Sequence, residues 1–140
     1  MNFEPTPDQY AFIETARSFA EHELAPFAAD WDVQHFFPIN TLRKAADLGF
    51  LGIYAHPDAG GLGLSRLDAA LIFEQLSQGC TTTAAYITIH NMCTWMVTQF
   101  GNEAQRAEYG SKLTSGEWLA SYCLTEPDAG SDAASLKTRA

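Results

Sequence analysis

The stretch that decides the fold is Tyr122-Cys123-Leu124-Thr125-Glu126-Pro127-Asp128-Ala129-Gly130-Ser131-Asp132, near the C-terminal end of the sequence. It passes from apolar residues into a small turn rich in side-chain oxygen atoms. The apolar part, Trp118, Leu119, Ala120, Tyr122 and Leu124, predicts a short buried strand of high β-propensity. Pro127 ends that strand because proline has no N–H to donate to a neighbouring strand.

The turn after this strand is predicted to bind an anion. Gly130 tolerates a positive φ, so the N–H groups of residues 130–132 can converge into a concavity. The hydroxyls of Thr125 and Ser131 lie on either side of the bend. No Lys or Arg is closer than Lys137, so backbone amides and hydroxyls would hold a phosphate. We expect a ligand with a polar heterocycle and phosphates; the alternative is an ordinary solvated turn.

Composition restricts the class of protein. The sequence has 140 residues, 46% of them hydrophobic, and a formal charge of −9, which suits one small domain or part of a larger protein. The acidic balance disfavours nucleic acid and anionic membranes as partners, and no apolar run is long enough to span a bilayer. The first residues carry no signal or transit pattern. Three cysteines without CxxC spacing favour a reducing compartment, either the bacterial cytoplasm or the mitochondrial matrix.

Upstream of the strand the sequence predicts five or six helices. Helix starts are expected at Thr6-Pro7, at Asn40, at Ser65 with Asp68 three residues later, at Thr81 and at Asn102. Pro26 is expected to kink or end the first helix, residues 31–37 to be irregular, and Gly49 to stop the second helix. Residues 81–100 are apolar on nearly all sides, which predicts a helix buried in a core or against a partner. Residues 136–140 are expected to begin a second strand.

Nucleotide-binding and metal-binding patterns are weak elsewhere. Gly60, Gly61 and Gly63 follow no parallel strand, so they do not form a dinucleotide fingerprint. Four histidines, His22, His35, His56 and His90, have no partners at ligand spacing, and we expect packed or surface histidines rather than a metal site.

Residues 123–132 resemble the flavin-binding signature of the acyl-CoA dehydrogenases, with Ser135 at a further small position. Residues 59–63 resemble the glycine-rich loop of that family, and residues 100–106 its segment before the flavin strand. The resemblance implies a mainly α fold: a helical N-terminal domain over residues 1–116, then the opening of a middle β-domain over residues 117–140. The family's catalytic glutamate belongs to a C-terminal domain outside this sequence, so no catalytic residue is assigned here.

Within that family, residues 64–68, 85–93 and 133–136 resemble the members that act on short branched-chain esters. The resemblance implies FAD-dependent oxidation of isobutyryl-CoA to methacrylyl-CoA in valine breakdown, a homotetramer, and an electron-transfer flavoprotein as electron acceptor. The implied FAD-binding residues are Tyr122, Cys123, Leu124, Thr125, Gly130 and Ser131. The implied acyl-CoA residues are Ser131, Ala84, Ala85, Thr88 and Met92. The alternatives are a dehydrogenase or oxidase of another chain length, and a non-catalytic helical binding module.

Overall fold

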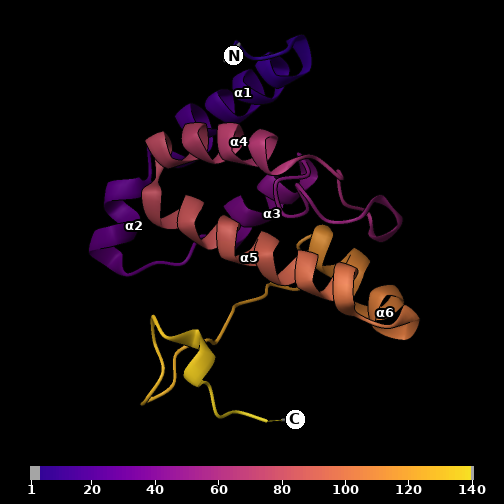
Figure 1. Ribbon diagram of the computed structural model, residues 1–140. Helices are drawn as coiled ribbons and strands as arrows, with labels where there is room; N and C mark the ends of the chain where they lie inside the picture. The colour runs from indigo at the N-terminus through magenta and orange to yellow at the C-terminus, as the bar shows by residue number, and fades with distance from the viewer. Residues whose placement is uncertain (1–3, 140) are drawn as a thin grey trace.

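The computed structural model describes residues 4–139, and most of them are helical. The first half contains α1 (Pro7–Phe19), the π-helical turn η1 (Ala20–Leu24), α2 (Ala28–Gln34), α3 (Ile39–Asp47) and the short η2 (Pro57–Ala59). The second half contains α4 (Arg66–Gly79), α5 (Thr81–Phe100), α6 (Glu103–Thr114) and the short η3 (Ala133–Ser135). In Figure 1, α1, α4, α5 and α6 pack side by side in that order, and the yellow C-terminal segment around η3 lies apart from them.

The starts of α1, α4 and α6 are set by local side-chain caps at Thr6, Ser65 and Asn102, where the sequence predicted helix starts. Each of these residues accepts a hydrogen bond from the backbone N–H three residues later, and its own backbone N–H donates one to the side chain of that later residue. Such capping boxes satisfy N–H groups that a helix end would otherwise leave without partners. The positions of α1, α4 and α6 along the chain therefore follow from the sequence alone.

The segment after α1 is more helical than predicted. Residues 31–37 were expected to be irregular, but Trp31 lies inside α2, which ends at His35 with a φ of 52°. The α1 run passes into η1 and then leaves the helix before α2, which agrees with the expected effect of Pro26. The helix expected to be capped by Asn40 begins at Ile39 instead, with Pro38 at the cap position and no side-chain cap bond.

The core lies between α1, α3, α4 and α5 and the turn that follows α3. Its fully buried large aliphatic side chains are Leu24, Leu42, Leu51, Ile53, Ile72, Leu76 and Ile87. Gly61 is required by close packing: a Cβ atom there would lie 2.1 Å from the carbonyl oxygen of Ala55. Two parts of the loop between α3 and α4, at Ala55 and Gly61, are therefore in close backbone contact.

The apolar sequence of α5 predicted burial in a core or against a partner, and the face of α5 that is buried in the described structure is mainly polar. Its buried residues are Thr83, Ala84, Ile87, His90, Asn91, Thr94 and Thr98. Several of its apolar side chains face outward instead, with Ile89 38% and Phe100 72% exposed. The polar side chains are tolerated inside because each bonds a backbone group or, for Thr83, the Cys80 sulfur.

The predicted strand over residues 118–124 is wrong for the described structure, and so is a strand at residues 136–139. Among residues 4–139 the only ladder contact is an isolated bridge between Glu126 and Ala129. A strand needs the backbone groups of a neighbour, and β-propensity alone does not supply them. Residues 119–125 therefore run as irregular chain away from the helices (Figure 1).

Candidate functional site

The segment that carries the predicted flavin residues leaves the helical layer at the end of α6. The Trp118 N–H donates to the Lys112 carbonyl at 3.0 Å, and the Lys112 ammonium lies 4.2 Å from the centre of the Trp118 indole ring. Leu119 packs against the core. These contacts give the segment a fixed starting point on the α6 side.

Ala120 is held by two side chains from α5. The Ala120 N–H donates to Nδ1 of His90 at 3.1 Å, and the Tyr86 hydroxyl donates to the Ala120 carbonyl at 3.2 Å. His90 is fully buried, and its Nε2 lies 2.9 Å from the Leu113 carbonyl. Burial lowers the pKa of His90, and the hydrogen bond to Leu113 opposes that shift, so the imidazole is neutral at pH 7.

Beyond Ala120 the predicted flavin residues are open to a ligand. Among residues 4–139, no backbone hydrogen bond involves residues 121–125. Tyr122, Cys123 and Thr125 are exposed, and Leu124 is half-buried. This short length of chain thus offers backbone N–H and C=O groups and one threonine hydroxyl toward solvent.

The turn after Thr125 is tight, but its glycine differs from the prediction. Glu126 and Ala129 exchange two backbone hydrogen bonds of 2.9 and 3.2 Å around Pro127. Gly130 is not among the glycines with positive φ, so the predicted anion-binding concavity does not form by that route. A Cβ atom added at Gly130 would meet nothing within 4 Å. Gly130 and the exposed Ser131 next to it therefore leave open space beside the turn.

The acidic side chains of the turn are all engaged locally. The Glu126 carboxylate accepts hydrogen bonds from the N–H groups of Lys137 and Thr138, both at 2.8 Å, and from the Thr138 hydroxyl. The Thr138 hydroxyl, with these N–H groups, lowers the pKa of Glu126. Asp128 pairs with Lys137 at 2.8 Å, and Asp132 accepts from the Ser135 hydroxyl. Glu126 thus ties the chain after η3 back to the turn, a structural role.

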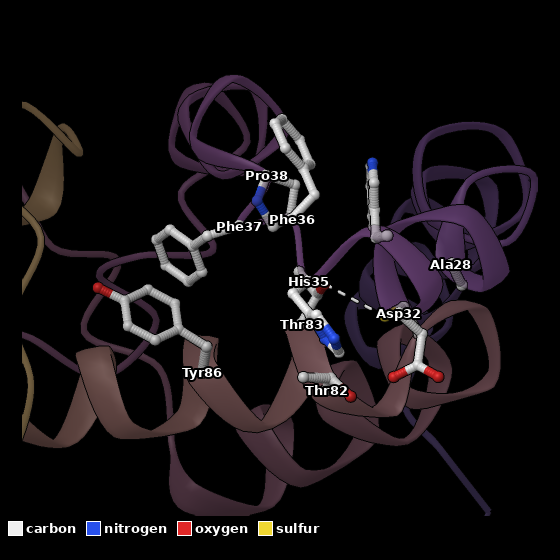
Figure 2. A pocket seen from close by; sticks show the side chains of 11 residues that line it. Ala28, Asp32, His35, Phe36, Phe37, Pro38, Thr82, Thr83 and Tyr86 are labelled. Carbon is white, nitrogen blue, oxygen red and sulfur yellow. Dashed lines mark hydrogen bonds between the residues drawn. The ribbon is translucent and has the colours of Figure 1, made fainter.

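A cavity of about 430 Å³ lies between α2 and the first turns of α5 (Figure 2). Part of its wall is aromatic, with Phe36, Phe37 and Trp31 on one side and Tyr86 on α5, next to Thr82 and Thr83. The rings of Phe37 and Tyr86 meet edge to face, with centroids 4.9 Å apart. Tyr86 therefore belongs both to the cavity wall and to the anchor of Ala120.

The residues predicted to contact the acyl group lie on α5, close to this cavity but not in its wall. Ala84 is buried, Ala85 is exposed, and Thr88 and Met92 are half-buried. The Thr88 hydroxyl donates to the Ala85 carbonyl at 2.7 Å. Sequence reasoning missed Tyr86 and Phe37; the run Phe36-Phe37-Pro38 before a helix was the signal that could have found the second.

The described part of the chain contains no group of three or more His, Cys, Asp or Glu side chains placed to hold a metal ion. No helix within the same residues is both long and apolar enough to cross a membrane.

Comparison with known proteins shows what the chain resembles. Residues 6–117 match the family profile described as "Acyl-CoA dehydrogenase, N-terminal domain". Mitochondrial isobutyryl-CoA dehydrogenase of Bos taurus is 54% identical over 95% of this chain and 32% of that protein. The Dictyostelium discoideum protein of the same name is 50% identical over 96% of this chain and 32% of its own length.

The fold is shared with solved structures. An acyl-CoA dehydrogenase from Bacillus anthracis, crystallised in complex with FAD, superposes with a TM-score of 0.84. It is 33% identical over 96% of this chain and 23% of that one. The chain spans about a third of the length of the curated relatives it matches.

Proposed function

The chain belongs to the acyl-CoA dehydrogenase family, and we propose that the whole protein oxidises isobutyryl-CoA to methacrylyl-CoA with FAD as cofactor. The observation that carries the proposal is 54% and 50% identity to two proteins named isobutyryl-CoA dehydrogenase. The coarser statement, an acyl-CoA dehydrogenase of short-chain substrates, rests on the same relatives. The valine-degradation role follows from the identity of the substrate.

The open segment and turn fit one edge of a flavin and its phosphates. Residues 121–125 have backbone donors and acceptors without partners among the described residues, and Thr125 and Ser131 are exposed. The Thr125 hydroxyl would donate to the pyrimidine edge of the ring, with Tyr122, Cys123 and Leu124 beside it. Ser131 would lie between pyrophosphate and substrate, next to the open space at Gly130. FAD supplies the hydride acceptor when bound; the Thr125 donor favours negative charge on that edge.

The acyl group is proposed to lie along α5, against Ala84, Ala85, Thr88 and Met92. Glu126 is committed to the backbone of residues 137 and 138, so we do not propose it as the base that takes the Cα proton. The chain's own contribution is thus to bind and orient the flavin and to form one wall of the acyl pocket. Ser131 would touch both the cofactor and the substrate.

The partners follow from the same assignment. We infer transfer of electrons to an electron-transfer flavoprotein, a homotetrameric assembly, and a location in the mitochondrial matrix, or in the cytoplasm of a bacterium. The names of the relatives, both mitochondrial, support the location.

Two measurements on the purified whole protein test the function. A flavin absorbance band with about one FAD per chain is expected, together with turnover on isobutyryl-CoA that exceeds turnover on straight-chain butyryl-CoA and longer esters. A preference for straight-chain esters would overturn the substrate and keep the family reaction. Rapid reaction of the reduced flavin with oxygen would indicate an oxidase instead.

Thr125→Val tests the predicted flavin contact. Loss of one hydrogen bond to developing negative charge, worth about 1.5–3 kcal/mol, should slow flavin reduction roughly 10- to 100-fold. Stopped-flow reduction by substrate measures this rate. An unchanged rate and flavin content would remove Thr125 from the site.

A further inference from the structure

Two side chains of α5 do for Ala120 what a neighbouring strand does in a sheet. A strand residue has its N–H and its C=O bonded to the next strand. Here the N–H of Ala120 bonds His90 Nδ1 at 3.1 Å and its C=O accepts from the Tyr86 hydroxyl at 3.2 Å. Tyr86 and His90 are four residues apart, so both point from one face of the helix, and their ring centroids are 6.2 Å apart.

The chemistry of the partners fixes the state of His90. The Leu113 carbonyl can only accept, so Nε2 carries the hydrogen. The Ala120 N–H can only donate, so Nδ1 must be the unprotonated nitrogen of a neutral ring. His90 therefore donates to a carbonyl near the end of α6 and accepts from an N–H at the start of the exposed segment. A side chain must supply both a donor and an acceptor to keep the two bonds.

Ala120 is also the last fixed point before the proposed flavin residues. Residues 121–125 make no backbone hydrogen bond among the described residues, and the next one is at Glu126. Tyr122 is two residues beyond Ala120, and Thr125 is five. A shift of Ala120 can be carried to these residues because no backbone hydrogen bond of residues 121–125 among the described residues opposes it.

We propose that Tyr86 and His90 are positioning residues for the flavin: by holding both backbone groups of Ala120, they set where residues 122–125 meet the cofactor. The inference rests on the proposed function. Neither side chain needs to touch FAD; each acts through the segment it holds. Tyr86 also forms part of the aromatic cavity wall with Phe37, so the cavity and the flavin segment share one support.

The test uses the whole protein and three variants, two of which separate the two bonds of His90. His90→Gln places an amide near Nε2, keeping a donor for Leu113 and removing the acceptor for Ala120. His90→Asn places an amide oxygen near Nδ1, keeping the acceptor for Ala120. Tyr86→Phe removes only the hydroxyl from a half-buried ring and folds without a cavity. The control, Thr98→Val, removes a buried hydroxyl elsewhere on α5 that bonds only the Trp95 carbonyl.

Flavin affinity is measured by titrating the apoprotein with FAD, and the absorbance spectrum of the bound flavin is recorded. Tyr86→Phe and His90→Gln should each raise the FAD dissociation constant about 2- to 12-fold, the range of one neutral hydrogen bond, and shift the bound-flavin spectrum. His90→Asn and Thr98→Val should bind FAD within twofold of the wild type with its spectrum. The weaker FAD binding of Tyr86→Phe should come with a fall in the unfolding temperature of the apoprotein no larger than that of Thr98→Val.

Three outcomes count against the inference. If Tyr86→Phe and His90→Gln keep the wild-type affinity and spectrum, the two residues only support the fold. If His90→Asn binds FAD as weakly as His90→Gln, the bond to Ala120 is not the cause. A wild-type protein that binds no FAD at all refutes the proposed function and this inference with it, whereas the first two results refute the inference alone.

Discussion

Replacing Asn91 by leucine should destabilise the fold more than any other isosteric change on α5. Asn91 is fully buried. Its side-chain amide both accepts a hydrogen bond from the turn after α3 and donates one to it. The Ile53 N–H donates to Oδ1 at 2.7 Å, and Nδ2 donates to the Phe50 carbonyl at 2.7 Å. Neither backbone group has another hydrogen bond among residues 4–139.

The magnitude follows from the two groups left without partners. Each buried orphan costs about 1–3 kcal/mol, or about 2–6 kcal/mol together. The leucine side chain returns part of this through apolar burial, so we expect a net loss of about 2–5 kcal/mol. The bond from Nδ2 to the Ile87 carbonyl at 2.9 Å adds little, because that carbonyl also accepts the helical N–H of residue 91.

Thermal unfolding measures the effect. For a chain of this length the unfolding entropy is roughly 0.3 kcal/mol/K, so the melting temperature should fall by roughly 7–17 °C. Thr94→Val is the matched control: Thr94 is equally buried on the same helix, and its hydroxyl donates to the His90 carbonyl, which keeps its helical bond. It should cost less than about 1 kcal/mol. If Asn91→Leu costs no more than Thr94→Val, the orphaned-group argument is wrong.

Three further changes have expected outcomes. Gly61→Ala forces a Cβ to 2.1 Å from the Ala55 carbonyl oxygen and should lower stability by about 1–3 kcal/mol in urea unfolding, whereas Gly130→Ala, with nothing within 4 Å, should stay within about 0.5 kcal/mol; equal midpoints would contradict the close contact at Gly61. Ser65→Ala removes the cap of α4 and should cost about 1 kcal/mol at pH 7. The Ser65 hydroxyl, then Gln9, lowers the pKa of Asp68 below 3.8, so this carboxylate stabilises the fold above pH 3.8 and the effect is lost as the pH falls through the lowered value; the alanine variant should lose less on acidification, and an unchanged acid limb would argue against the Ser65 bond. Burial lowers the pKa of His90 below 6.5, so the unfolded chain protonates first and stability should fall as the pH drops below 6.5; His90→Asn should flatten that slope between pH 7.5 and 5.5, and a parallel slope would assign it to other groups.

Local features of the fold could be predicted from the sequence, because their causes lie within a few residues. Thr6, Ser65 and Asn102 each sit three residues before the side chain that completes the cap, so the starts of three helices were readable. Gly49 likewise ends α3 with a φ of 79°. The mainly helical fold class is confirmed on this basis.

Features with distant causes could not be predicted. The polar inner face of α5 depends on carbonyl and N–H groups of residues 50, 53 and 113, which no pattern within α5 reveals. The strand expected at residues 118–124 does not form, although these residues have high β-propensity. A strand needs a neighbouring strand to bond with, and the described residues do not supply one. In the candidate site, the residues of the flavin signature stay predictions, while their support from Tyr86 and His90 emerged only from the structure.

Helix α5 buries a mainly polar face and exposes several apolar side chains. The residues that hold the helix in the fold are therefore not the residues that face outward. The amides, hydroxyls and imidazole on the buried side hold α5 in place. Ala85, Ile89 and Met92 on the other side are exposed or half-buried and contribute little to this packing. Side chains on the outward side are then free to change in size and shape, so under the proposed function a new substrate preference could evolve there without changes to the buried face.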